Sequence, residues 1–243
     1  MSNRIGIFDS GIGGYTIYKA CVEKYPHHAF VLLADQLHLP YGDKSREDLL
    51  DIFDSMMNAF RSLDIHVVLI ACNTMSSLLT KEVRTKYEDL TLISIIEPTL
   101  SLVDDGLDVL ILATQATLSS NIYQRELISK NPQRQVIEVW GRNLAKLIEE
   151  GDEDAIESFI NDYIAPHSVP QILLACTHYP LISHQIKKVS DAILIDSIEV
   201  LSRCAKDYPP SRESSMIFAT SNPQGFQSKI KRLFQDDVQV HSL

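Results

Sequence analysis

Two stretches of the sequence, residues 67–74 and 172–178, share one pattern: an apolar run, then Ala-Cys, then small polar residues. Each places a thiol where a buried strand would end and a helix would begin. Backbone N–H groups at a helix N-terminus favour a thiolate and lower the thiol pKa below its ordinary value of about 8.5. Cys72 and Cys176, the latter with His178 beside it, are therefore candidates for chemistry, and we expect a lowered pKa at both.

Three other interpretations of these residues are open. A single cysteine at a strand end is more often a small buried side chain, so the argument depends on finding two in matching contexts. A Cys-His pair is typical of a protease, but a protease would leave the second Ala-Cys unexplained. Cys72, Cys176 and His178 could bind zinc, yet they lack the close paired spacing of usual zinc sites, so we expect no metal. Cys21 and Cys204 lack such polar neighbours and are expected in the core.

Residues 9–14 read DSGIGG and follow the first apolar run. Glycines after a strand let backbone N–H groups approach a ligand, and a helix starting near Gly13 would turn its positive end toward an anion. The loop is not the dinucleotide fingerprint, since Thr16 stands where a glycine is needed, and no Gly-Lys-Ser/Thr follows as in a P-loop. We expect it to hold a carboxylate or phosphate; the alternative is a tight turn only.

Short apolar runs bounded by turn residues recur along the chain and are expected to be strands buried on both faces. Helical patterns separate them, such as residues 45–62 with apolar side chains at spacings of three and four. This alternation predicts parallel α/β sheets, with ligands beyond the carboxyl ends of the strands. The expected strands are 4–8, 29–34, 66–71, 91–96, 108–113, 135–139, 170–175, 192–196 and 215–219.

The composition narrows the class of protein. The chain has 243 residues, 22 Lys and Arg against 32 Asp and Glu, and a formal net charge of −10. This charge argues against a nucleic-acid partner, which needs a basic surface. Four widely spaced cysteines do not suggest a disulfide framework. Without an apolar leader or a long apolar segment, we expect a cytoplasmic protein with no membrane partner.

Several motifs together resemble the cofactor-independent glutamate racemases of the aspartate/glutamate racemase superfamily. The resemblance spans roughly residues 4–200, and the motifs are specific only jointly. They are Asp9 to Gly14, Asp35 with Pro40-Tyr41-Gly42, Ala71 to Thr74, Ile96-Glu97-Pro98, and Ala175 to Leu181.

The resemblance implies a racemase that interconverts L- and D-glutamate without a cofactor and supplies D-glutamate for peptidoglycan. Inversion at Cα needs a base on one face and an acid on the other. The implied catalytic residues are Cys72, Cys176, Asp9, His178 and Glu149, with Cys72 acting on D-glutamate. The implied substrate-binding residues are Ser10, Pro40, Tyr41, Gly42, Asn73, Thr74, Thr117 and Thr177.

The expected fold class is α/β, with two pseudo-symmetric domains, each a mostly parallel sheet flanked by helices, and the active site in the cleft between them. We expect residues 1–97 and about 208–243 to form the first domain and 98–207 the second. The resemblance also implies a homodimer, and the short N-terminus leads us to expect no activation by a cell-wall precursor. The alternatives are an aspartate or broader acidic amino-acid racemase, and a non-catalytic amino-acid-binding protein.

Two positions depart from the family pattern. Ala116 stands where a glycine is usual, and Trp140-Gly141-Arg142 replaces the usual Ala-Cys-Pro. We expect the Arg142 side chain on the surface.

Overall fold

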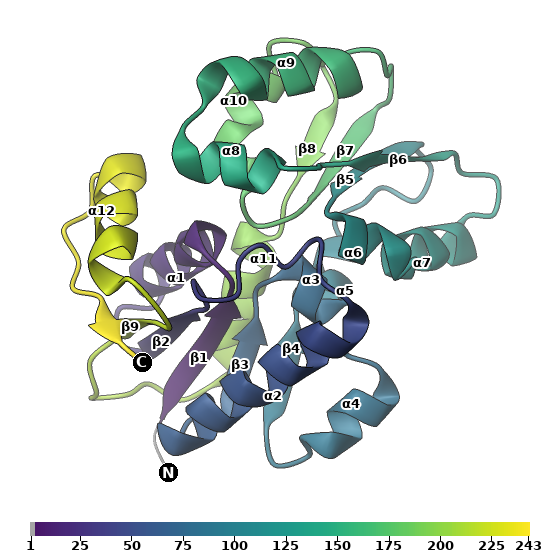
Figure 1. The fold of residues 1–243 in the computed structure, drawn as a ribbon. Coiled ribbons are helices and arrows are strands. Elements are labelled where there is room, and N and C mark those ends of the chain that lie inside the picture. Colours follow the sequence, from purple (N-terminus) through teal and green to yellow (C-terminus); the bar gives the residue numbers. More distant parts are fainter. Residues whose placement is uncertain (1–2) are drawn as a thin grey trace.

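A computed structural model describes residues 3–243. These residues form two sheets of parallel strands, and one sheet lies above the other in Figure 1. The first sheet, in the order β10-β9-β2-β1-β3-β4, contains β1 (Arg4–Asp9), β2 (Ala29–Ala34), β3 (Val67–Ile70), β4 (Thr91–Ser94), β9 (Met216–Ala219) and β10 (His241–Ser242). The second sheet, in the order β6-β5-β7-β8, contains β5 (Val109–Ala113), β6 (Val136–Trp140), β7 (Gln171–Ala175) and β8 (Ile193–Ile195).

The two sheets repeat one topology. The order β2-β1-β3-β4 in the first matches β6-β5-β7-β8 in the second, and every strand pairing described is parallel. The predicted pseudo-symmetric α/β fold is thus confirmed. In such sheets the carboxyl ends of the first and third strands flank the point where the strand order reverses, which is where ligands bind. Cys72 and Cys176 follow the third strand of each repeat, β3 and β7.

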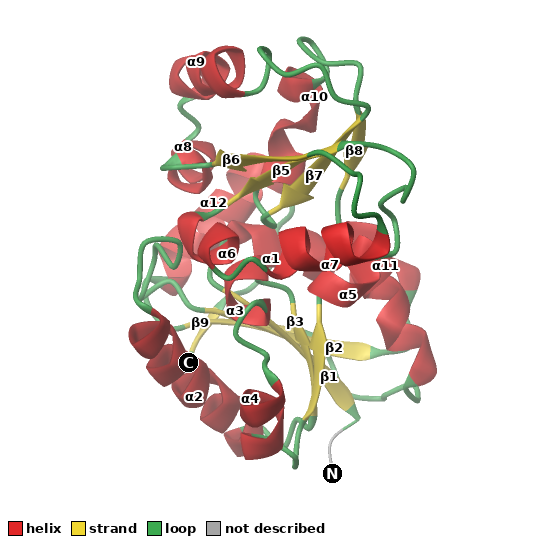
Figure 2. Ribbon diagram, turned by 90° about the vertical axis from the view of Figure 1, so that its right-hand side faces the viewer, coloured by secondary structure: helices red, strands yellow, loops and turns green. Residues whose placement is uncertain are grey.

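Helices form three layers around the sheets (Figure 2). The outer face of the first sheet is covered by α2 (Arg46–Ser62) and α4 (Lys81–Lys86), and that of the second by α8 (Leu144–Glu150), α9 (Glu153–Tyr163) and α10 (Ser183–Ile186). Between the sheets lie α1 (Ile12–Lys24), α5 (Ile96–Leu100), α7 (Ile122–Lys130) and α11 (Ile198–Arg203), with α12 (Pro223–Phe234) beside α1. The short helices are α3 (Asn73–Ser76), α6 (Gln115–Ser119) and the 3₁₀ turns η1 (Tyr179–Ile182) and η2 (Cys204–Asp207).

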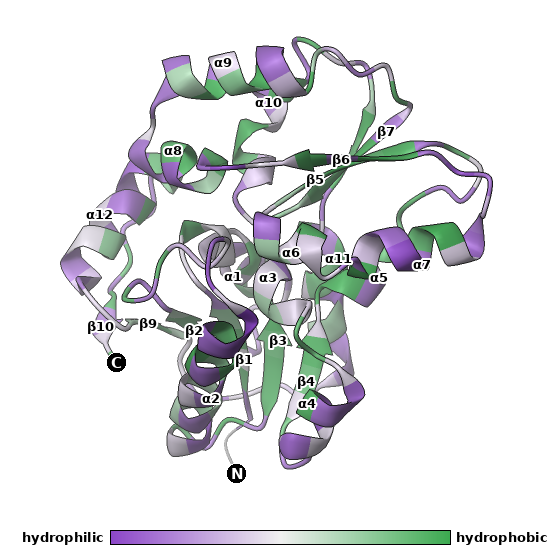
Figure 3. Cartoon of the chain, turned by 45° about the vertical axis from the view of Figure 1, so that its right-hand side comes forward, coloured by the Kyte–Doolittle hydropathy of each residue, from purple (hydrophilic) through white to green (hydrophobic). Residues whose placement is uncertain are grey.

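The hydrophobic core follows from the alternation of side chains along each strand. In β1, Ile7 packs between the sheets while Phe8 packs under α2; in β7, Leu173 faces the central layer and Leu174 the outer helices. The strands are therefore apolar on both faces, as their colour in Figure 3 shows. One core cluster contains residues of both sheets, so the two halves are held together by buried apolar surface.

Helix α2 illustrates how the sequence fixes a local element. The Ser45 hydroxyl accepts a hydrogen bond from the Asp48 backbone N–H at 3.1 Å and caps the first turn. Leu49, Phe53 and Phe60 are among the side chains of its buried face, as the spacing predicted. The helix thus begins one residue after the predicted start and ends at the predicted residue.

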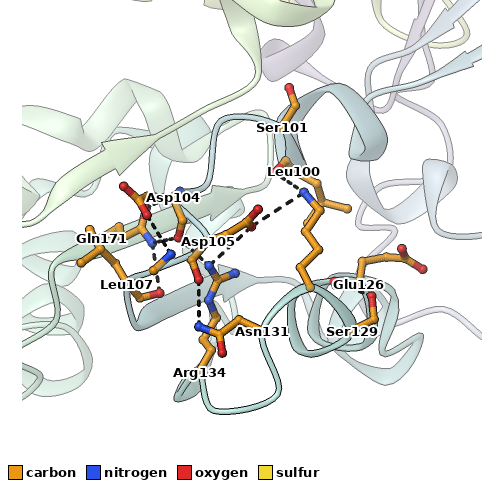
Figure 4. A network of polar contacts seen from close by, with 12 residues as sticks. Leu100, Ser101, Asp104, Asp105, Leu107, Glu126, Ser129, Asn131, Arg134 and Gln171 are labelled. Atoms are coloured by element: carbon orange, nitrogen blue, oxygen red, sulfur yellow. Dashed lines mark hydrogen bonds and ion pairs between the residues drawn. The ribbon is translucent and has the colours of Figure 1, made fainter.

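A network of hydrogen bonds lies at the end of the second sheet where its strands begin, opposite their carboxyl ends (Figure 4). The buried Arg134 guanidinium donates to the backbone carbonyl of Asp104, and the Gln171 side chain donates to the same carbonyl at 3.0 Å. Gln171 also accepts from the Asp104 N–H at 3.1 Å, and Asn131 donates to the Asp105 carbonyl at 2.8 Å. These bonds fix the loop that enters β5 to the starts of β6 and β7.

The chain crosses between the sheets twice, after β4 through α5 and after β8 through α11, which packs on α1. The predicted division near residues 97 and 207 remains a prediction. Among the helices of residues 3–243, none is long and apolar enough to span a membrane.

Candidate active site

A cavity of about 360 Å³ lies where the strand tips of the two sheets face each other. Most of its wall follows strands: Ser10 after β1, the loop Leu39–Asp43 after β2, Cys72–Thr74 after β3, Thr114 and Gln115 after β5, Trp140, Arg142 and Asn143 at β6, and Cys176–His178 after β7. Helices α8 and α12 form the rest of the wall, with Ala145, Lys146, Glu149 and Glu150 of α8 and Lys229 of α12. The volume suits a small-molecule ligand.

The structure brings the sequence-predicted site residues together. Those that line the cavity are Cys72, Cys176, His178, Glu149, Ser10, Pro40, Tyr41, Gly42, Asn73, Thr74 and Thr177. Asp9 and Thr117, both buried, lie behind the wall and contact residues that line it. The roles assigned to these residues remain proposals.

Cys72 and Asp9 lie close together on the side of the first sheet. Asp9 is fully buried and accepts hydrogen bonds from the Gly11 N–H at 2.8 Å and from the Thr177 hydroxyl at 3.0 Å. Burial raises the pKa of Asp9, although His178 and these hydrogen bonds oppose the shift. Burial and the Asp9 carboxylate also raise the pKa of Cys72 well above its ordinary value, against two backbone N–H groups of α3.

The expected lowered pKa of Cys72 is therefore wrong. The helix N–H groups are present as predicted, but α3 has only four residues, and desolvation outweighs their effect. A cation bound next to Cys72 would oppose this shift and favour its thiolate.

Cys176 lies at the start of a chain of polar contacts on the side of the second sheet. Its Sγ atom is 3.7 Å from His178 Nδ1, and His178 Nε2 is 2.9 Å from Glu149 Oε1. Lys229 donates to Glu149 Oε2 at 2.5 Å. Burial opposes a charged imidazole, but the contacts with Cys176 and Glu149 outweigh it and raise the pKa of His178 well above its ordinary value. Burial would raise the pKa of Glu149, whereas His178 and Lys229 lower it to about 2.

The glycine loop holds carboxylates of the protein itself. Besides the Gly11 N–H on Asp9, the Ile12 N–H donates to Glu149 Oε1 at 3.3 Å. A Cβ atom at Gly11 would lie 2.4 Å from Glu149 Oε1, and one at Gly13 would lie 2.7 Å from the backbone carbon of Thr177. Of this loop, Ser10 lines the cavity. The predicted anion is thus found, but it is a side chain, and the glycines permit close packing of α1 against the second sheet.

We expect Gly13→Ala to separate the two halves at the site. The new methyl group would overlap the Thr177 backbone, so α1 must move and the hydrogen bond from Thr177 to Asp9 would break. Overpacking of this kind costs about 1–3 kcal/mol. Thermal unfolding should show a lower Tm, and the rate of a reaction carried out in this cavity should fall about tenfold or more.

Gly106→Ala is the matched control, because the nearest atom to its Cβ is the Asp104 carboxylate at 3.3 Å in an exposed loop. A Gly13→Ala protein as stable and active as the Gly106→Ala protein would contradict the packing argument.

Hydroxyl and amide groups also line the cavity. Thr74 Oγ1 lies 2.9 Å from Thr114 Oγ1, and Thr117 bonds to Thr114 at 3.0 Å behind them. The buried Tyr123 hydroxyl donates to Asn73 Oδ1 at 2.5 Å and fixes the amide. Asn73 Nδ2 has no partner within residues 3–243, which leaves one buried donor for a ligand.

The loop after β2 is anchored by the buried Asp35. The Tyr41 hydroxyl donates to it at 2.6 Å, and the Thr220 hydroxyl at 2.7 Å. The peptide between Leu39 and Pro40 is cis. The Gly42 carbonyl accepts a hydrogen bond at 3.1 Å from the backbone N–H of Ala116 in α6. This loop therefore connects the two halves at one end of the cavity.

Arg142 was expected on the surface, and its side chain is exposed but also lines the cavity. Its guanidinium carbon lies 5.4 Å from the Trp140 ring centre and 5.2 Å from that of Tyr163. The backbone at Arg142 is left-handed, with φ of 26°. Cation–π contacts therefore hold a positive charge at the rim of the cavity.

Sequence reasoning missed several residues of the wall. Residues 109–114 are a weaker third copy of the pattern at Cys72 and Cys176, but Thr114 was not among the predicted site residues. Lys229 gave no such signal, since it lies on an amphipathic helix and reaches the site only through the packing of α12.

A cavity with one thiol from each of two repeated α/β halves is suited to taking a proton from a carbon centre and returning one. The fold and this site place the protein in the class of amino-acid racemases. A family model described as Asp/Glu/hydantoin racemase matches residues 10–205. The chain therefore belongs to the Asp/Glu/hydantoin racemase family, and the resemblance stated from its motifs is confirmed.

Curated relatives and solved structures agree with this assignment. The chain is 34% identical to glutamate racemase of Carboxydothermus hydrogenoformans over 82% of this chain and 77% of that one. It is 31% identical to glutamate racemase of Prochlorococcus marinus over 94% of this chain and 92% of that one. The structure of Francisella tularensis glutamate racemase in complex with D-glutamate is similar with a TM-score of 0.88 and 28% identity, covering 99% and 97% of the two chains.

Proposed function

We propose that the protein is a glutamate racemase that interconverts L- and D-glutamate with Cys72 and Cys176 as its two bases and without a cofactor. The observation that carries the proposal is that each half contributes a thiol, after the third strand of its repeat, to one cavity. One thiolate takes the α-proton while the other thiol delivers a proton to the opposite face. The two thiols exchange these roles between the two enantiomers. Cys72 is assigned as the base that takes the proton from D-glutamate.

The substrate carboxylates are expected on the neutral donors of the wall. The Asn73 amide donor is buried and without a partner among the described residues, so a carboxylate oxygen there would satisfy it. The hydroxyls of Thr74 and Thr177 and the backbone of Ser10 and the Pro40–Gly42 loop surround the same space. Fixed donors of this kind also stabilise the negative charge that develops when the α-proton leaves.

The substrate ammonium group provides a cation beside Cys72. The pKa of this thiol is raised because it is buried next to Asp9. An ammonium ion bound near both groups would favour the thiolate and hold Asp9 ionised. The proposal thus assigns substrate binding a second role, the activation of the base.

Circular dichroism of the purified protein with L-glutamate or D-glutamate is the deciding assay. We expect the optical signal of either enantiomer to decay to zero, because the equilibrium mixture is racemic. Parallel reactions with L- and D-aspartate test the alternative of an aspartate or broader racemase, and we expect slower turnover there. A stable signal with glutamate would contradict the proposal, and a stable signal with all four substrates would favour a binding protein.

The remaining parts of the proposal rest on the family resemblance. They are the supply of D-glutamate for peptidoglycan, the cytoplasmic location and the homodimer. The names of the relatives above support glutamate as the substrate.

A further inference from the structure

Lys229 is a charged residue of the cavity that the proposed reaction does not use. It lies on α12, which stands beside α1 in Figure 1 and contacts α8 through the side chains of Lys229 and Arg232. Its Nζ atom donates to Glu149 Oε2 at 2.5 Å, while Glu149 Oε1 is 2.9 Å from His178 Nε2. The two oxygens of one carboxylate are therefore divided between a lysine on one side and the imidazole on the other.

The rest of α12 holds α8 in the same position. Arg232, one turn after Lys229, donates to the carbonyls of Glu149 and Glu150, the latter at 2.9 Å. These carbonyls belong to the last turn of α8, where a cation is favourable. Phe226 and Ile230 bury the other face of α12 in the core between the sheets. The backbone of Glu149 is thus fixed by α12, and so is its carboxylate.

We propose that Lys229 is a positioning residue for the racemase reaction: by holding the outer oxygen of Glu149, it keeps the inner oxygen on His178 and so orients the imidazole toward Cys176. This inference rests on the proposed function for its catalytic meaning. Its structural content is a chain of four side chains, from Lys229 of α12 through Glu149 of α8 to His178 and Cys176, which both follow β7.

The charge of Lys229 also limits how tightly His178 binds its proton. The Glu149 carboxylate favours a protonated ring, and the ammonium group partly cancels that attraction because it lies on the far side of the same carboxylate. The charged and titratable groups that act on His178 within residues 3–243 are Asp9 at the end of β1, Cys176 after β7 and Glu149 of α8, with Lys229 of α12 behind Glu149 and Tyr179 of η1 beside Cys176.

The test compares Lys229→Met with Lys229→Arg and with Lys231→Met. Lys231 is on the same helix but is 69% exposed and pairs with Asp237 at 3.9 Å, so its replacement removes the same charge away from the site. Rates of alkylation by iodoacetamide are measured from pH 5 to 10 at Cys72 and Cys176 separately by mass spectrometry. The same variants are assayed for kcat and KM with glutamate.

Removing a cation makes the Cys176–His178 pair lose its proton less readily. We expect the midpoint of Cys176 alkylation in Lys229→Met to rise by about one pH unit, while that of Cys72 moves far less. We also expect kcat to fall about tenfold with little change in KM. Lys229→Arg should restore both values, and Lys231→Met should match the unmodified protein.

Several results would overturn the inference. These are an unchanged Cys176 midpoint in Lys229→Met, an equal shift in Lys231→Met, or a rise in KM alone, which would make Lys229 a substrate contact. If the unmodified protein does not racemise glutamate, the proposed function fails, but the alkylation midpoints still test whether Lys229 acts through Glu149 on Cys176.

Discussion

Replacing either Cys72 or Cys176 by serine is expected to reduce glutamate racemisation by about 10³-fold or more, because a hydroxyl is a far weaker acid than a thiol and cannot supply the base at neutral pH. Both thiols line the cavity and are buried. The substitution replaces one sulfur atom by oxygen and leaves the shape of the wall nearly unchanged. Circular dichroism with each enantiomer gives the rate. The loss should be similar for the two variants, since inversion needs both faces.

Solvent exchange separates a two-base reaction from a one-base reaction. In D₂O, a variant that keeps only one of Cys72 and Cys176 should exchange the α-proton only of the enantiomer that presents it to the remaining cavity cysteine, and return deuterium to the same face. Cys204→Ser is the matched control, because Cys204 is half-buried on η2, outside the cavity wall, with Val200 O as its contact at 3.7 Å. Racemisation that survives loss of Cys72 or Cys176, or is lost equally with Cys204, would rule out the proposed roles.

The fold could be predicted because buried parallel strands have a distinctive pattern. The nine expected strands are present, each within two residues of its expected bounds. The short β10 was missed, since two residues, His241 and Ser242, are too few for a periodic pattern. The strand order was not predicted, although it is what places Cys72 and Cys176 at equivalent points.

The pattern of residue types predicted the candidate site where it follows strands, whereas Glu149 on α8 came from the family resemblance. Residues after apolar runs, such as Cys176 and His178, were found because parallel sheets place strand ends at one edge. Residues that act from behind the wall gave different signals: the loop at Gly11 and Gly13 was noticed, but its contacts with Glu149 and Thr177 depend on how the halves pack. The pKa of Cys72 was predicted in the wrong direction because sequence shows a helix start but not desolvation.

The second large effect is expected from Glu149→Gln. Three donors, the imidazole of His178, the ammonium group of Lys229 and the Ile12 N–H, converge on this buried carboxylate, and a glutamine amide has only one acceptor oxygen to offer them. Breaking a buried ion pair by removing one partner costs about 3 kcal/mol here, the lower end of the usual range, because Lys229 can turn to solvent. Without this counter-charge, His178 should lose its proton, and we expect racemisation to fall about 10²-fold.

The pH dependence of stability tests the same contact without substrate. The pKa of Glu149 is lowered from 4.5 to about 2, so its contribution is present above pH 4.5 and is lost as the pH falls from there toward 2. The pKa of His178 is raised above 6.5, so its contribution is complete below pH 6.5 and is lost as the pH rises through the folded-state pKa.

The difference in unfolding free energy between the unmodified protein and Glu149→Gln should therefore be largest between pH 4.5 and 6.5. Denaturant unfolding from pH 3 to 8 measures it, with the exposed Glu157→Gln on α9 as control. A difference that is constant over this range would mean that Glu149 contributes by packing alone, because only an ionised pair makes stability follow the two pKa values.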